Sequence, residues 1–308
     1  MTKPKRIGWI GTGRMGFALC NRLLDAGADL AVYNRTVAKT APLAERGATV
    51  VDAPVDLADR DIVFTMVAGP ADVLAVTLGE RGVLGGDGPK PSVLVDSSTI
   101  DPETSTQLRE HASQLGTAVL AAPVSGNPKV VASGNLTAVV SGPRDAYETA
   151  RPYLEAFGRK VTYVGGGDEA RLVKIAHNLL LGIVAQSMAE ITVLTEAAGV
   201  SRGDFLEFLN DSVMGSTFTR YKTPALVNLE FKPTFTWHLL RKDFELGLAA
   251  GRDMNVPLPA AALVHQLIIE GIGQGYGDDD FAALLVKTAR GAGMELVTED
   301  REVDDGLT

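Results

Sequence analysis

A glycine pattern near the N-terminus constrains the fold of this chain more than any other feature. The segment RIGWIGTGRMG (6–16) places three glycines directly after a short apolar run and at the start of a helical pattern. In that context the first glycine permits a tight turn, the second lets the backbone approach a pyrophosphate, and the third lets helix and strand pack. The sequence therefore predicts a dinucleotide site, in preference to a plain glycine-rich turn, with cofactor contacts from Gly11, Thr12, Gly13, Arg14, Met15 and Gly16.

The residues after the second apolar run indicate which nicotinamide cofactor is used. About 20 residues beyond the glycines, NAD-binding domains carry an acidic residue that accepts hydrogen bonds from the adenosine ribose. This sequence has Asn34, Arg35 and Thr36 there. A guanidinium beside small polar groups suits a 2′-phosphate, so these residues predict NADP(H) in preference to NAD(H). The alternative is that Arg35 is a solvated residue at the start of the next helix.

Short β-branched runs alternate with helical patterns from residue 6 to about 164, which is typical of βαβ units around a parallel sheet. Helices are expected at 14–26 and 102–115, the second with Asp101 as its N-cap. We predict an α/β fold with a doubly wound Rossmann-type domain over 1–166. The expected strands are 6–10, 29–34, 61–67, 92–97, 117–122, 136–142 and 160–164.

Residues 167–308 have a different pattern. Their apolar residues follow a period of 3.6 with no convincing strand, so we predict an all-helical domain. Its first helix, a long interdomain helix, is expected at 168–198, with acidic residues in its first turn and Gly199 just beyond its end. The acidic tail 298–308 is expected to be frayed.

Composition and charge exclude several classes of function. The 308 residues include 29 basic and 38 acidic side chains, a formal charge of −9, so no footprint for nucleic acid or an acidic membrane is expected. The single Cys20 allows no internal disulfide, fits a reducing cytoplasm and is interpreted as buried filler. No signal peptide and no metal site are expected. The longest apolar run, 179–189, is shorter than the ~20 residues that span a bilayer.

Loops after the strands are the expected ligand sites, because open α/β sheets bind ligands outside the carboxyl ends of their strands. Val67 and Ala68 form a small loop that suits the pyrophosphate or ribose, and Thr99 ends a DSST segment whose hydroxyls suit the nicotinamide. Ser125 and the amides around Gly126 suit a small anion. Each loop alone is more often an ordinary turn, but their shared sheet edge favours a ligand site.

Lys174 and Asn178 interrupt an apolar stretch and share one helix face, because positions i and i+4 do so. Three structural interpretations are a lysine that reaches solvent, a lysine paired with a carboxylate of the neighbouring domain, and a small-residue packing seam from Gly182 to Ala189. A functional lysine is favoured because the helix follows a dinucleotide domain and must border its cleft. Partial burial lowers the pKa of a lysine, which suits proton exchange with a substrate oxygen. His177 is less favoured as the base.

Four motifs together resemble the β-hydroxyacid dehydrogenase family, also called the 3-hydroxyisobutyrate dehydrogenase family, over roughly residues 5–292. GWIGTGRMG resembles its cofactor signature, APVSGN…SGNLTAVVSG its substrate segment, GGGDEARLVKIAHN its catalytic segment, and LLRKDFELGLAAGRDMNVPLP its C-terminal cofactor segment. The resemblance implies an oxidoreductase acting on CH–OH groups. Hydride would pass reversibly between the nicotinamide and a short β-hydroxy acid or its semialdehyde or aldehyde acid. It also implies that the helical domain serves substrate binding and oligomerisation, and that a homodimer or tetramer forms through it.

Residue roles are implied by the same resemblance. Lys174 would be the general acid/base and Asn178 its helper. Lys242 and Asp243 would close the cofactor site from the helical domain, and Thr99 would lie near the nicotinamide. The residues implied or expected at the substrate are Ser125, Gly126, Asn127 and Lys129.

The substrate segment departs from the family pattern, which reads D-A-P-V-S-G-G. Ala121 stands in place of the aspartate and Asn127 in place of the second glycine, while Lys129 adds a charge that either binds a carboxylate or points to solvent. Two other functions stay open. Imine reduction is disfavoured because imine-reducing relatives typically lack the lysine, and a non-catalytic NADP-binding module is disfavoured because Lys174 and Asn178 are both present.

Overall fold

The computed structural model describes residues 4–307 and divides into two compact units, residues 1–174 and 175–308. The first unit is α/β and the second is helical, which confirms the predicted fold class. The division falls inside the long helix α7 (Glu169–Ala197). The expected boundary at residues 166 and 167, just before that helix begins, stays a prediction.

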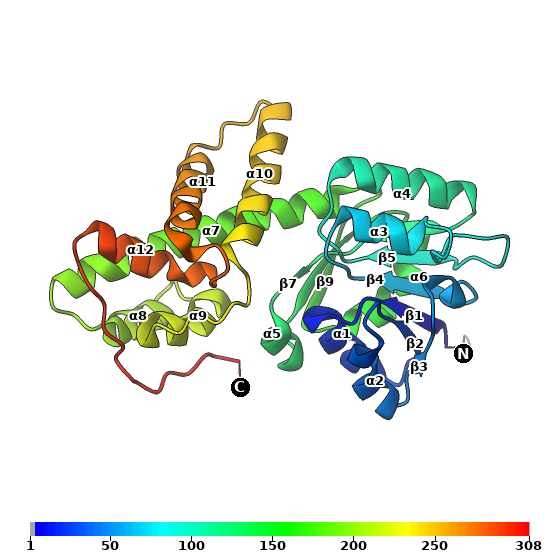
Figure 1. Ribbon diagram of the computed structural model, residues 1–308, viewed down its shortest axis with the longest axis horizontal. Helices are drawn as coiled ribbons and strands as arrows, with labels where there is room; N and C mark the ends of the chain where they lie inside the picture. Colours follow the sequence, from blue (N-terminus) through cyan, green and yellow to red (C-terminus); the bar gives the residue numbers. More distant parts are fainter. Residues whose placement is uncertain (1–3, 308) are drawn as a thin grey trace. The chain divides into compact units, whose positions relative to one another are not determined.

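A nine-stranded sheet forms the centre of the first unit (Figure 1). Six of its strands run parallel in the order β3-β2-β1-β4-β5-β6, which is the order of a doubly wound dinucleotide-binding sheet. All seven predicted strands are present, and the two additional ones have only two residues each. The strands are β1 (Arg6–Ile10), β2 (Asp29–Tyr33), β3 (Thr49–Val50), β4 (Ile62–Thr65), β5 (Val93–Asp96), β6 (Ala118–Ala121), β7 (Val124–Ser125), β8 (Thr137–Ser141) and β9 (Lys160–Gly165).

The parallel sheet expected from the βαβ pattern becomes mixed beyond β6. Strand β8 pairs antiparallel with both β6 and β7, whereas β9 pairs parallel with β8. A parallel connection needs a crossover that carries the chain back along the sheet. The only helix between β6 and β8 is α5 (Pro128–Ala132), whose five residues span only ~7.5 Å.

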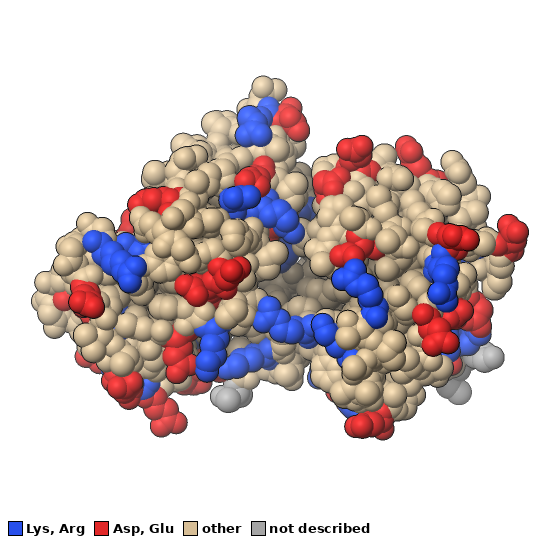
Figure 2. All heavy atoms as spheres, in the orientation of Figure 1, with Lys and Arg blue, Asp and Glu red and all other residues tan. Residues whose placement is uncertain are grey.

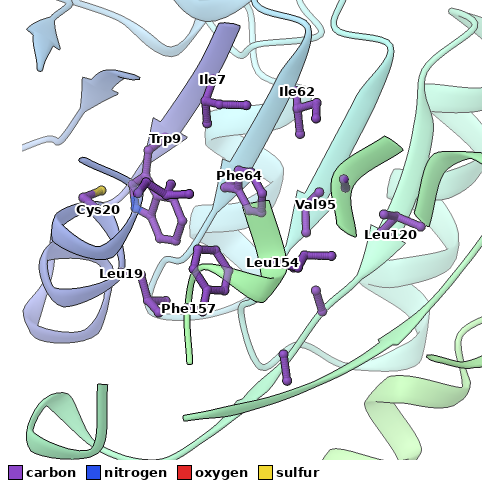
Figure 3. Packing of buried hydrophobic residues seen from close by; sticks show 14 of the residues in the cluster. Ile7, Trp9, Leu19, Cys20, Ile62, Phe64, Val95, Leu120, Leu154 and Phe157 are labelled. Atoms are coloured by element: carbon purple, nitrogen blue, oxygen red, sulfur yellow. The ribbon is translucent and has the colours of Figure 1, made fainter. Parts of the chain in front are cut away.

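Helices and an aromatic cluster complete the first unit. The rings of Trp9 and Phe64 stack with centroids 5.4 Å apart, and Phe157 packs edge-on against both. Cys20, on α1, points into the same apolar cluster (Figure 3) and is fully buried, which raises the pKa of its thiol and confirms its interpretation as filler. The remaining elements are α1 (Arg14–Asp25), η1 (Val37–Thr40), α2 (Ala41–Glu45), η2 (Pro54–Leu57), α3 (Pro70–Thr77), α4 (Pro102–Gln114) and α6 (Arg144–Glu155).

Asp101 is the N-cap of α4, as predicted. Its carboxylate accepts hydrogen bonds from the backbone N–H of Thr104 (2.8 Å) and from the Thr104 hydroxyl (2.9 Å). Burial disfavours ionisation, but the hydrogen bonds from Thr104 outweigh it, so the pKa of Asp101 lies below its ordinary value. A lowered folded-state pKa contributes stability above the unfolded-state pKa, and this contribution disappears as the pH falls through the folded-state pKa.

We expect Asp101→Ala to lower the free energy of unfolding by about 1 kcal/mol at neutral pH, because α4 loses its cap. The difference from the unchanged chain should shrink as the pH falls below ~4. Urea unfolding of both proteins at neutral and acidic pH measures this difference. Asp87→Ala, in an exposed loop, is the control, and a destabilisation by Asp101→Ala that does not depend on pH would contradict the capping role.

The second unit is helical. No strand occurs between residues 175 and 307, as predicted, and Gly199 follows α7 with a φ of 87°. Its elements after α7 are α8 (Arg202–Asp211), α9 (Thr217–Asn228), α10 (Trp237–Asp253), α11 (Pro259–Gly271), η3 (Ile272–Tyr276), η4 (Phe281–Ala283) and α12 (Leu284–Gly291).

Residues 298–307 of the C-terminal tail have no regular structure, but the expectation that the tail is frayed is wrong for its first residues. The two carboxylate oxygens of Glu299 accept hydrogen bonds from the backbone N–H groups of Arg202 (2.7 Å) and Gly203 (3.1 Å). Arg301 pairs with Asp204 at 2.6 Å. These contacts hold the tail, because Glu299 accepts hydrogen bonds from backbone N–H groups and Arg301 pairs with an acidic side chain, all at the start of α8.

Helix α7 is long and apolar enough to cross a membrane by length and composition alone, with a mean hydropathy of 1.4 over an 18-residue window. Of that window, 44% is buried inside the structure. A core helix of a globular protein meets the same criterion, so this is weak evidence for a span. On the face shown in Figure 2, basic and acidic side chains are interspersed on each unit.

Candidate active site

The glycine loop between β1 and α1 lines a cavity of about 690 Å³ in the first unit. Two of its glycines are required by the packing of the protein itself. Gly11 has a φ of 98°, and a Cβ on it would lie 2.3 Å from the carbonyl oxygen of Met66, while a Cβ on Gly16 would lie 1.9 Å from the carbonyl oxygen of Gly11. Gly13 differs, because a Cβ there would have no atom within 4 Å. Packing therefore does not explain Gly13, but a ligand that approaches the backbone would.

The N-terminus of α1 offers an anion site at the same place. Gly13 is its N-cap, no side chain caps the helix, and its first turn contains no acidic residue. The first N–H groups and the helix dipole therefore present positive charge beside the cavity, which Arg14 and Met15 also line. Thr12 does not line the cavity: it is buried, and its N–H donates to the Asn34 side-chain oxygen at 2.9 Å.

The predicted segment at the end of β2 lines the other part of the cavity. Asn34, which lines the cavity, connects the loop after β1 to the loop after β2, since its side-chain amide also donates to the carbonyl oxygen of Thr36 at 2.9 Å. The side chain of Arg35 is 84% exposed, and its Nη1 lies 3.1 Å from an oxygen of Asp72. This exposed ion pair is weak and leaves most donors of the guanidinium available to a ligand.

Two further cations line the cavity that sequence reasoning missed, Lys39 and Arg81. Lys39 follows Arg35 by only four residues, and this closeness in the sequence could have assigned it to the same site. Arg81 comes from the segment after α3, and nothing in the local sequence assigns it to the site. We call Arg35, Lys39 and Arg81 the cationic corner. Asp52 and Asp72 also line the cavity and partly offset this charge.

The loops after β4 and β5 are joined to one another. Val67 and Ala68 line the cavity, and the N–H of Val67 donates to the Ser98 hydroxyl at 3.0 Å. Their contact with a cofactor stays a prediction. Thr99, the next residue, is half-buried but is not among the residues that line the cavity.

The expected substrate loop follows β7 and is built around a short helix. Ser125 is half-buried at the end of β7, and Lys129 is exposed on α5. Gly126 has a φ of 138°, and a Cβ there would lie 2.8 Å from the Val130 side chain, so a glycine is required. The Asn127 side-chain oxygen accepts a hydrogen bond from the N–H of Val130 at 3.1 Å and caps α5. Asn127 before a proline is itself a cap signal, and it accounts for this residue without a substrate.

Lys174 and Asn178 lie one turn apart on α7, Lys174 half-buried and Asn178 only 4% exposed. The Asn178 amide is held at both ends. Its nitrogen donates to an oxygen of Asp243 at 2.6 Å, and its oxygen lies 3.0 Å from Nδ1 of His177. His177 is an exposed neighbour, in agreement with its lower ranking as a base.

The small residues farther along α7 have a packing role. A Cβ on Gly182 would lie 2.4 Å from the Phe244 ring, and a Cβ on Gly247 would lie 2.6 Å from the Leu179 side chain. Helices α7 and α10 therefore pack closely in the second unit, and the packing-seam interpretation holds for Gly182. It does not account for the polar end of that face.

Two family models match the chain: the NAD-binding domain of 6-phosphogluconate dehydrogenase at residues 6–165, and the NAD-binding domain of NADP-dependent 3-hydroxyisobutyrate dehydrogenase at residues 169–287. The uncharacterized oxidoreductase YfjR of Bacillus subtilis is 34% identical over 91% of this chain and 98% of its own length. The chain belongs to the β-hydroxyacid dehydrogenase family. It is accordingly an NAD(P)-binding oxidoreductase of the CH–OH class.

Two further similarities extend over most of the chain. Glyoxylate/succinic semialdehyde reductase 2, chloroplastic, of Arabidopsis thaliana is 29% identical over 91% of this chain and 78% of its own length. A solved structure of Psf3 in complex with NADP+ and 2-OPP has a TM-score of 0.80 and 27% identity, covering 91% of this chain and 99% of that one.

The cofactor segment expected in the helical part of a β-hydroxyacid dehydrogenase lies on α10. Asp243 is only 2% exposed and is the acceptor for Asn178. Its other oxygen is buried with no hydrogen-bond partner among the described residues, although Nζ of Lys242 lies 3.7 Å from it. The contact of Lys242 and Asp243 with the cofactor stays a prediction. Among residues 4–307, no group of three or more His, Cys, Asp or Glu side chains is placed to hold a metal ion.

Proposed function

We propose that this chain transfers hydride reversibly between NADP(H) and a short β-hydroxy acid or its semialdehyde or aldehyde acid, with Lys174 as the general acid/base. The observation that carries the proposal is the cavity of the first unit. It combines an open glycine, Gly13, at an uncapped helix N-terminus with the cations Arg35, Lys39 and Arg81 of the cationic corner, all of which line the same cavity. NADP(H) matches both features, because its pyrophosphate suits the helix N-terminus and its additional 2′-phosphate suits the cationic residues.

The preference for NADP(H) is supported by the residues at the end of β2. Asn34 is neutral where NAD-binding domains carry an acid, so it does not repel a 2′-phosphate. Arg35 is exposed beside the cavity and can exchange its weak pair with Asp72 for a charge-assisted bond to that phosphate. Lys39 and Arg81 line the same cavity and add positive charge to it.

Lys174 supplies the proton chemistry in this proposal. A bound nicotinamide would supply or accept the hydride. In reduction, the Lys174 ammonium donates a proton to the carbonyl oxygen as the carbon receives hydride, giving the alcohol. In oxidation, the neutral amine accepts the hydroxyl proton. Asn178, whose amide is fixed by Asp243, orients the reacting oxygen.

The substrate class is supported by the loop after β7 and by the relatives. Ser125 and the amide at Gly126 suit a carboxylate, and Lys129 adds a positive charge nearby in sequence. The Arabidopsis relative is named for glyoxylate and succinic semialdehyde, both short aldehyde acids.

A substrate panel with both cofactors tests the proposal. We expect purified protein to reduce an aldehyde acid faster with NADPH than with NADH, or to oxidise a 3-hydroxy acid faster with NADP+ than with NAD+, each followed by nicotinamide absorbance. Arg35→Ala should raise the KM for NADPH about tenfold, because a charge-assisted bond is lost, and leave the KM for NADH nearly unchanged.

The control for that series is Arg46→Ala, which removes an exposed arginine paired with Asp25 outside the cavity. Turnover of cyclic imines alone would favour imine reduction instead. Cofactor binding without turnover of any compound in the panel would favour a non-catalytic module.

We also propose a cytoplasmic homodimer or tetramer assembled through the helical unit. The single buried Cys20 suits a reducing compartment. Large apolar side chains on the helical unit are exposed, including Leu194, Phe208 and Leu263, as expected of a surface that associates. Light scattering of the purified chain gives its mass, and a monomer would contradict the assembly.

A further inference from the structure

A buried arginine lies one turn before the lysine of α7. The side chains of Arg171 and Asp96 are 7% and 0% exposed, and Nη2 of Arg171 donates to an oxygen of Asp96 at 2.9 Å. Arg171 also donates from Nη1 to the carbonyl oxygen of Ser98 (3.1 Å) and from Nε to the Ser105 hydroxyl (2.9 Å) and to Asp168 (3.1 Å). All of these residues belong to the first unit.

Asp96 connects this arginine to two loops at the ends of the strands. Its second oxygen accepts hydrogen bonds from the Thr65 hydroxyl at 2.6 Å and from the N–H of Ser98 at 3.2 Å. The Ser98 hydroxyl in turn accepts a hydrogen bond from the N–H of Val67, a residue that lines the cavity. The pair therefore ties the ends of β4 and β5 to the first turn of α7.

Stability alone does not account for a pair buried this deeply. Removing two charges from water costs free energy that their attraction often fails to recover, and apolar replacements of such pairs are frequently as stable. The arrangement does fix the orientation of the arginine side chain. A guanidinium offers five donors in a rigid fork, and here they reach β5, α4 and the turn before α7 at once.

We infer that Arg171 and Asp96 are a positioning pair that sets Lys174 relative to the loop of Ser98. The inference rests on the proposed role of Lys174 in proton transfer. Lys174 follows Arg171 by three residues, a rise of ~4.5 Å on neighbouring helix positions, so anchoring Arg171 fixes the point from which the lysine extends. Proton transfer demands this control, because a displacement of about 1 Å can cost a hundredfold in rate.

Two variants test the pair. Arg171→Lys keeps the charge but loses the fork. Arg171→Met combined with Asp96→Asn removes both charges together and keeps a group for Thr65 and Ser98 to bond. For both we expect kcat to fall about 10- to 100-fold, while the thermal unfolding temperature and the dissociation constant for NADPH stay close to those of the unchanged chain. The loss should persist across the pH profile, since misplacement is not corrected by changing protonation.

Arg151→Met is the matched control, since Arg151 pairs with Glu155 on the exposed surface of α6. A kcat equal to that of the unchanged chain in the double variant would overturn the inference and leave the proposed function intact. Loss of folding in both test variants would overturn it too and assign the pair to stability. An unchanged chain that turns over no compound of the panel would instead refute the proposed function itself, and the inference with it.

Discussion

Replacing Lys174 with arginine is expected to lower kcat by about 10²- to 10⁴-fold, the range that general acid/base catalysis contributes. Arginine keeps the positive charge and much of the length, but a guanidinium does not release its proton in proteins. Lys174→Met removes the charge as well and should be at least as slow. The measurement is steady-state turnover of the best substrate in both directions, together with NADPH binding followed by fluorescence.

The binding measurement separates proton transfer from cofactor recognition. Both variants should bind NADPH nearly as well as the unchanged chain, because the glycine loop and the cationic corner are untouched. Lys160→Ala, at the exposed start of β9, is the control and should keep full turnover. Substantial turnover by Lys174→Arg would show that the residue acts only as a charge, and another group would have to carry the proton.

Two glycines of the loop, Gly13 and Gly16, are expected to fall into two classes. Gly13→Ala should weaken NADPH binding about 10- to 100-fold, as when hydrogen bonds to a charged group are lost, since the added Cβ occupies the approach to the α1 N-terminus. Its stability should hold, because that Cβ meets no protein atom within 4 Å. Gly16→Ala should instead lower the free energy of unfolding by about 1–3 kcal/mol, since its Cβ would lie 1.9 Å from a carbonyl oxygen.

Thermal unfolding with and without NADPH distinguishes the two classes. NADPH should raise the unfolding temperature of the unchanged chain and of Gly88→Ala, a control in open space, but much less that of Gly13→Ala. Equal NADPH stabilisation of Gly13→Ala and the control would mean that the pyrophosphate does not approach this helix end.

Local patterns predicted much of this molecule because their physical causes are local. The glycine loop, the Asp101 cap, the bounds of α7 and the strands β1, β2, β4, β5 and β6 follow from hydrogen bonds and apolar periods within a few residues. The same holds for the residues at the end of β2, which line the cavity. Their contact with a cofactor stays a prediction. The Asn127 cap was equally local and could have been predicted from the proline that follows it.

Other features depend on segments that meet only after folding. The antiparallel pairing of β8, the contribution of Arg81 to the cavity and the order of the tail through Glu299 have no signature in their own neighbourhoods. Each arises from contact with a distant segment.

The polar face of α7 shows most clearly which features follow from local sequence and which depend on distant segments. The sequence by itself determined that Arg171, Lys174 and Asn178 share a face, because helix geometry follows from local spacing. Only the tertiary structure decided their different surroundings: Arg171 is bound to Asp96, and Asn178 is bound to Asp243. A buried charge or amide must find a partner, and a partner 65 or 75 residues away is chosen by the packing of the whole chain, not by the pattern of one helix.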